Sequence, residues 1–251
     1  MSSPAETLLL FVAGFLAGAV NAVAGGGSLI SFPALLAVGY PALTANVTNT
    51  VAIWPGYVGS TLAFRAELEG QASRLWRFAS AAAAGAALGA VLLLALPDRV
   101  FAQVVPWLVL LSAVLLAAQP RLAKALRARR PGTDHRSLPL LVLLFLASMY
   151  GAYFGGGLGV ILLAVLGVFL QEALHRINAL KSALSLLINT VALLAFVTFG
   201  PVAWDALAVI APASLLGGTA GARLTRRLDP RVLRVLIVCL GVAVGLALLL
   251  R

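Results

Sequence analysis

The sequence predicts an all-α integral membrane protein built from two inverted-topology repeats, each with a glycine-broken helical hairpin plus three transmembrane helices. Composition, an internal repeat and the distribution of basic residues predict this class. Of the 251 residues, 62% are hydrophobic and only 10% are charged, whereas about a quarter of an ordinary soluble domain is charged. The apolar residues fall in runs of the length that spans a membrane as helix. Strand-like alternation is absent, which disfavours an outer-membrane barrel.

Two parts of the chain repeat one pattern in a fixed register. The triplet Gly25–Gly27 recurs 130 residues later as Gly155–Gly157, and Asn46 recurs 132 residues later as Asn178. The second offset is kept as far as Arg99 and its counterpart Arg231. A register held over some fifty residues indicates a duplication.

Each copy is expected to contain five helical segments. In the first copy they are 8–24, 28–39, 46–64, 75–95 and 100–118, and in the second 138–154, 158–170, 178–199, 205–222 and 232–250. The segment 28–39 would rise only about 18 Å, which is less than the hydrocarbon core of roughly 30 Å. Whether these short arms span or re-enter is left open. The chain divides into a first transmembrane repeat (1–118), a basic cytoplasmic linker (119–137) and a second transmembrane repeat (138–251).

The basic residues predict the orientation in the membrane. Lys and Arg concentrate in loops 65–77, 119–137 and 223–234, whereas 97–99 and 200–204 carry almost none. Basic loops face the cytoplasm, so both termini are expected in the periplasm of a bacterial inner membrane. The two copies then have opposite orientations. Inverted repeats with interrupted helices recur in secondary transporters, whose substrate site lies at the repeat interface.

The glycine triplets are the first candidate site. Three consecutive glycines interrupt a helix, and broken backbone within a membrane is tolerated only where it is buried in protein or lines a wet cavity. A helix that restarts at Ser28 or Leu158 would direct its N–H groups at the break, which favours an anion. The alternative is that the glycines allow close helix packing.

A second motif lies at the start of the third segment of each copy. Asn46 and Asn178 either cap these helices or contact a substrate. Lys181 is the most deeply placed cation, and it either pairs with an anionic substrate or extends to the membrane surface. The candidate substrate-binding residues are Gly25, Gly26, Gly27, Ser28, Asn46, Thr48, Asn49, Gly155, Gly156, Gly157, Asn178, Lys181 and Ser182.

Several functional classes are not expected. No Asp or Glu lies clearly inside a span, which weakens a carboxylate proton relay, a cation transporter and an intramembrane hydrolase, so we expect no enzyme. The net charge of +10 arises at the ends of apolar runs, which argues against nucleic-acid binding. Cys239, His135 and His175 have no ligand neighbours at metal-binding spacing, so neither a metal nor a cofactor is expected. The expected partners are a small anionic substrate and the lipid bilayer, and a homo-oligomer is left open.

Four segments carry a resemblance to a known family. They are GFLAGAVNAVAGGGSLISFPAL, ANVTNTVAI, YGAYFGGGLGVILLAVLG and RINALKSALSLLIN. Together they resemble the sulfite exporter TauE/SafE family over nearly the whole chain. The resemblance implies a bacterial cytoplasmic-membrane permease for sulfur-containing or organic anions, such as sulfite or sulfonate breakdown products. Leu158 stands where the first copy has Ser28, so the two copies need not contribute equally.

The function expected from these observations is secondary transport of a small anion, in the direction of export. An anion channel-like pore and a non-transporting membrane assembly factor remain alternatives.

Overall fold

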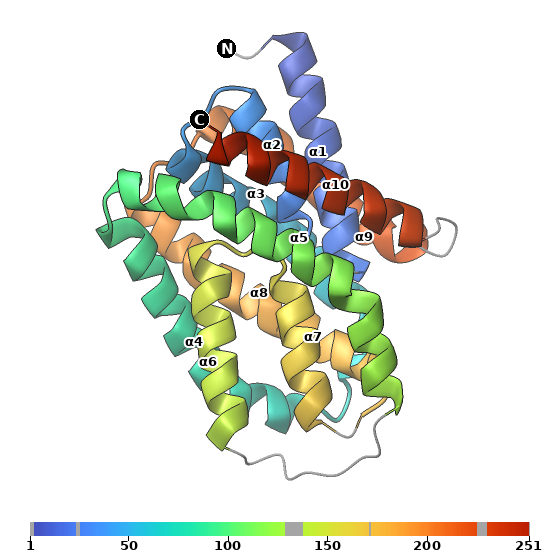
Figure 1. Ribbon diagram of the computed structural model, residues 1–251. Coiled ribbons are helices and arrows are strands. Elements are labelled where there is room, and N and C mark those ends of the chain that lie inside the picture. The colour runs from blue at the N-terminus through green and yellow to red at the C-terminus, as the bar shows by residue number, and fades with distance from the viewer. Residues whose placement is uncertain (1–2, 24–25, 129–137, 171, 225–229, 251) are drawn as a thin grey trace.

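The computed structural model describes residues 3–23, 26–128, 138–170, 172–224 and 230–250 (Figure 1). Its helices are α1 (Pro4–Val23), α2 (Ser28–Ala37), α3 (Ala42–Ala63), α4 (Ala72–Ala95), α5 (Asp98–Ala128), α6 (Leu138–Tyr153), α7 (Leu158–Phe169), α8 (Leu174–Phe199), α9 (Trp204–Leu224) and α10 (Pro230–Leu249), with a short 3₁₀ turn at Ala66–Leu68. These residues contain no strand. The all-helical prediction is confirmed.

The helices have the lengths and surfaces of a membrane protein. Within the described residues, four are long and apolar enough to cross a bilayer, in α1, α4, α5 and α8. One exposed face of α5 carries Val104, Trp107, Leu111 and Val114. Their spacing of three or four residues places them on one side of the helix, where lipid can cover a surface that would be unfavourable in water.

Among the helix starts that differ from the sequence prediction, two bear on the candidate site. Helix α3 begins at Ala42 after Pro41, and α8 begins at Leu174. Asn46 and Asn178 therefore lie in the second turn of their helices, and the interpretation that they are N-caps is wrong. Proline at position 41 suits a helix start because it has no N–H to leave unpaired and its φ is already helical. Helix α5 also continues to Ala128, ten residues beyond the expected end of that segment.

Helices of each half pack against helices of the other half. Helix α1 packs on α9 and, correspondingly, α6 packs on α4, while α5 packs on α10 (Figure 1). Gly85 of α4 lies against the carbonyl of Phe145, and its repeat counterpart Gly217 lies against the carbonyl of Phe15. Glycine allows such close backbone approach. Equivalent contacts thus run in both directions between the halves, as they do in a two-fold pair.

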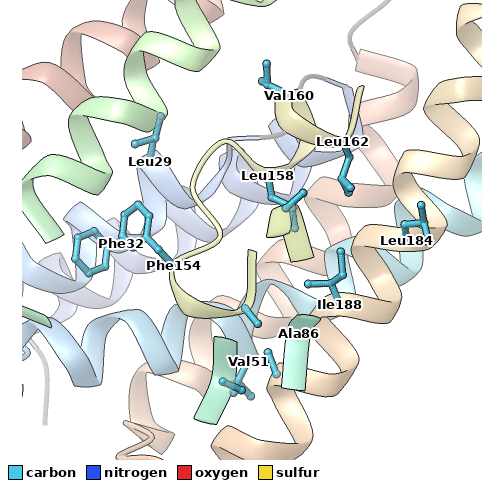
Figure 2. Close-up of a cluster of buried hydrophobic side chains, with 14 of the residues drawn as sticks. Leu29, Phe32, Val51, Ala86, Phe154, Leu158, Val160, Leu162, Leu184 and Ile188 are labelled. Carbon is cyan, nitrogen blue, oxygen red and sulfur yellow. The ribbon is translucent and has the colours of Figure 1, made fainter. Parts of the chain in front are cut away.

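The core joins the two glycine-broken hairpins. Phe32 of α2 packs edge-on against Phe154 in the second break, with ring centroids 5.6 Å apart. Figure 2 shows this pair beside Leu158 of α7 and Ile188 of α8. The described glycines of the first break, Gly26 and Gly27, and Phe154, Gly156 and Gly157 of the second are buried in the protein rather than exposed at its lipid-facing surface.

Candidate functional site

Both glycine triplets interrupt the helical backbone, as expected. Helix α1 ends at Val23 and α2 starts at Ser28, and the second interruption separates α6 from α7. Gly26, Gly155 and Gly157 have φ values of 125°, 80° and 73°, which glycine adopts at the lowest cost. Gly25, one of the candidate residues, lies outside the described residues.

The first break is polar. Asn21 of α1 is 3% exposed, and its Oδ1 accepts hydrogen bonds from the amides of Gly26 (3.1 Å) and Gly27 (2.8 Å). Ser31 Oγ donates to Asn49 Oδ1 at 2.5 Å and lies 3.3 Å from the Gly27 carbonyl oxygen. The amides of two candidate residues, Gly26 and Gly27, are thus already bonded to a side chain.

The second break is closed mainly by apolar packing. Gly151 stands at the repeat position equivalent to Asn21. A Cβ at Gly151 would lie 2.8 Å from the side chain of Leu158. The Tyr150 hydroxyl donates to the Gly156 carbonyl at 2.6 Å and lies 2.9 Å from Ser112 Oγ. The leucine therefore fills the space that an asparagine would need.

The two breaks meet within the protein. Asn46 Nδ2 donates to the Tyr153 carbonyl at 3.0 Å, and a Cβ on Gly155 would lie 4.0 Å from Ser28 Oγ. We define the junction as the side chains Asn21, Ser28, Ser31, Asn46 and Asn49 with the backbone of 153–157.

Lys181 lies in another part of the protein. Its side chain is 2% exposed, and Nζ has no hydrogen-bond partner among the residues the structure describes. The adjacent Ser182 accepts a hydrogen bond on its carbonyl from Thr61 Oγ1 at 3.2 Å, near the end of α3. The twelve residues from Asn49 to Thr61 rise about 18 Å, so Lys181 and the junction are separate. The ammonium is buried in protein rather than extended to a surface.

The remaining candidates have different surroundings. Thr48 Oγ1 accepts the amide of Ala203 at 2.9 Å and so connects α3 to the segment before α9. Ser182 Oγ lies 3.4 Å from Ser60 Oγ, and Asn178 is half-buried.

The candidate list missed two side chains of the junction, Ser31 and Asn21. The available signal for Asn21 was an amide side chain in an apolar run, a few residues before a glycine triplet whose backbone amides would need acceptors. The Nδ2 of Asn21, together with Asn46 Oδ1 and Asn49 Nδ2, has no hydrogen-bond partner within the described part of the chain.

Two loops at equivalent repeat positions carry polar contacts between the halves. In the α2–α3 loop, Tyr40 donates to Asp205 at 2.7 Å, and burial with this hydrogen bond raises the pKa of Tyr40 to about 12. In the α7–α8 loop, Glu172 pairs with Arg74 (2.5 Å) and Arg176 (3.0 Å). The hydrogen bond from Arg74 is the main cause that lowers the pKa of Glu172 below its ordinary value.

Known proteins resemble this chain over most of its length. A sequence model of the family described as "Sulfite exporter TauE/SafE" matches residues 10–248. A "Probable membrane transporter protein" of Haemophilus influenzae is 28% identical over 93% of this chain and 90% of its own. "Probable membrane transporter protein ORF9" of Sinorhizobium sp is 28% identical over 96% of this chain and 91% of its own length. "Probable membrane transporter protein YfcA" of Escherichia coli K12 is 27% identical over 99% of this chain and 91% of its own length. No solved structure gives a significant match.

Proposed function

Because the chain belongs to the sulfite exporter TauE/SafE family, we propose that this membrane transporter exports small anions by secondary transport. The proposed substrates are sulfur-containing or organic anions, such as sulfite or the products of sulfonate breakdown.

The buried ammonium of Lys181 is the observation that carries the anion proposal. Lys181 is the eighth residue of α8, about 10 Å along the helix from its start. A cation within a span costs about 2.5–3.5 kcal/mol on insertion scales. Since no described residue pairs with this ammonium, it is available to a substrate anion.

The helix contacts support an inverted-repeat transporter. The exchanged packing of α1 on α9 and α6 on α4 agrees with repeats 1–118 and 138–251 on either side of a cytoplasmic linker, 119–137. The loop of Tyr40 contacts the poorly basic side of α9, and the loop of Glu172 contacts the basic region that contains Arg74. We infer that the first contact is periplasmic, with both termini, and that the second is cytoplasmic. Alternating access would open these two ends in turn.

Sulfite flux in proteoliposomes tests the proposal. We expect Lys181→Met to reduce flux at least about tenfold, a loss equivalent to about 1.4 kcal/mol. Lys181→Arg should retain part of it, because a planar guanidinium does not replace a compact ammonium. The control is Lys124→Met, which removes an exposed cation near the end of α5 and should leave flux unchanged.

Thermal unfolding separates transport from folding in this test. The Met variant should melt at or above the wild-type temperature, because it removes an unpaired buried charge. Unchanged flux in a folded Lys181→Met protein would remove Lys181 from the substrate path and with it the main support for the proposal.

Two other measurements address the alternative functions. Linear, non-saturating flux without stimulation by anion on the opposite side would indicate a channel-like pore. Absence of any thermal shift with sulfur oxyanions or carboxylates, together with absence of flux, would indicate an assembly factor.

A further inference from the structure

The junction contains three buried polar atoms without partners in the described structure. Two are donors, Asn21 Nδ2 and Asn49 Nδ2, and one is an acceptor, Asn46 Oδ1. All three side chains are at most 3% exposed. Buried polar groups in folded proteins are nearly always hydrogen-bonded, so a set of three at one place indicates that something else binds there.

Each asparagine amide has an oxygen and an NH₂ group, and the partner bound to one of them shows that the other is free. Asn21 Oδ1 accepts two backbone N–H groups, so its NH₂ must be the free end. Asn46 bonds to the carbonyl of Tyr153, which can only accept, so its oxygen must be free. The single hydrogen of the Ser31 hydroxyl is assigned to Asn49 Oδ1 at 2.5 Å rather than to the Gly27 carbonyl at 3.3 Å, so the NH₂ of Asn49 is its free end. The pattern of two donors and one acceptor therefore follows from the partners of these amides.

The three asparagine side chains are connected through neighbouring contacts. Asn46 and Asn49 are three residues apart on α3 and so lie on one face of the helix. Asn21 is connected to Asn49 through Gly27 and Ser31. The carbonyl of Tyr153, at the second break, adjoins the same face through Asn46.

This pattern does not match a bare oxyanion. Anionic oxygens would accept from the two NH₂ groups, but they would repel Asn46 Oδ1 and leave it unpaired. An O–H group on the ligand satisfies that oxygen. We propose that the junction binds a small oxyanion that carries one O–H, with the anionic oxygens on Asn21 and Asn49 and the O–H donating to Asn46 Oδ1. This inference rests on the proposed anion transport and narrows its substrate class.

Two kinds of ligand combine an anionic oxygen group with one O–H. One is a protonated oxyanion such as hydrogensulfite, and the other is an organic sulfonate with a hydroxyl group. In the first case the proton would cross the membrane on the substrate itself, without a carboxylate relay.

A matched pair of probes tests the O–H requirement. The full-length protein in lipid nanodiscs is titrated with 2-hydroxyethanesulfonate and ethanesulfonate, which have the same charge. If hydroxylated sulfonates are the source, the hydroxylated probe should bind about tenfold tighter or more, because the other leaves a buried acceptor unpaired. If protonated oxyanions are the source, sulfite flux should rise as the pH is lowered below neutrality, while ethanesulfonate flux stays constant.

Two variants test whether Asn46 causes the preference for a ligand with an O–H group. Asn46→Leu should bring the binding ratio to about one, or remove the pH dependence of sulfite flux. Asn189→Ala should change neither, since Asn189 is equally buried but bonds to a carbonyl of its own helix, that of Ser185. The wild-type measurements decide the question even where a variant fails to fold.

Equal binding of the two sulfonates together with pH-independent sulfite flux would overturn the inference, and would indicate that water satisfies the three atoms. Anion flux that persists in that case would leave the proposed function standing. Absence of any anion flux would overturn both.

Discussion

The two glycine breaks have the same triplet but different chemistry. In the first, Asn21 Oδ1 accepts the amides of Gly26 and Gly27, and the NH₂ of Asn21 has no partner among the described residues. In the second, Gly151 and Leu158 replace the polar pair with apolar packing. The glycines produce the interruption, and the neighbouring side chains decide whether its surroundings are polar or apolar.

The loops outside the breaks differ in the same way. Tyr40 makes a single hydrogen bond to Asp205, whereas its repeat counterpart Glu172 forms ion pairs with Arg74 and Arg176. Loops at equivalent positions of the proposed repeat therefore carry different charges.

The largest expected effect on stability comes from Gly27→Ala. A Cβ at this position would overlap the backbone carbonyl of Ala17, so α1 and α2 would have to move apart. We expect a loss of about 3 kcal/mol in the free energy of unfolding, the upper end for overpacking. Denaturant unfolding in detergent measures it. A loss below that of Gly157→Ala would contradict the overlap expected between a Cβ at position 27 and the Ala17 carbonyl.

Asn21→Ala should have the next largest effect. It leaves two amides of the first break without their acceptor, at a cost of about 2 kcal/mol. The matched change in the second break, Gly151→Ala, meets only the flexible side chain of Leu158 and should cost less. The melting temperatures of the two variants give the comparison. Equal losses of stability would mean that the hydrogen bonds to Asn21 do not distinguish the two breaks.

Gly157→Ala tests backbone strain in the second break. The new Cβ has ordinary space beside Leu115, but φ is 73°, and this conformation costs about 1 kcal/mol for alanine. Gly157→Asn should recover part of the loss, because asparagine tolerates positive φ. If both variants are as stable as the wild type, the strain is relieved locally and the break is more adaptable than its geometry indicates.

The smallest expected effect concerns the charged loop. Glu172→Gln removes ion pairs near the surface and should cost less than about 1 kcal/mol. Because the folded pKa of Glu172 is lowered, its contribution is present above the unfolded value of about 4.3 and is lost as the pH falls through the folded pKa. Melting temperature against pH should be flatter for the variant in this acidic range. Tyr40→Phe should also flatten the profile in this range, because it removes the hydrogen bond from Tyr40 that lowers the pKa of Asp205.

The sequence alone determined the class of the protein and most helix positions. Apolar runs and glycine triplets act locally, because helix formation and its interruption depend on residues adjacent in the chain. The segments 158–170 and 205–222 accordingly fall within one or two residues of α7 and α9. The proposed duplication also rests on the sequence, because its register is defined by residue positions alone.

Tertiary structure alone decided which polar residues meet. Asn46 reaches Tyr153, 107 residues away, and Thr48 reaches Ala203, 155 residues away, so no local pattern could distinguish their roles. Lys181 and Asn49 have equivalent repeat positions, yet the antiparallel packing of α3 and α8 separates them. Side-chain partners depend on how distant helices cross, and that crossing is set by packing across the whole bundle rather than by the residues beside each side chain.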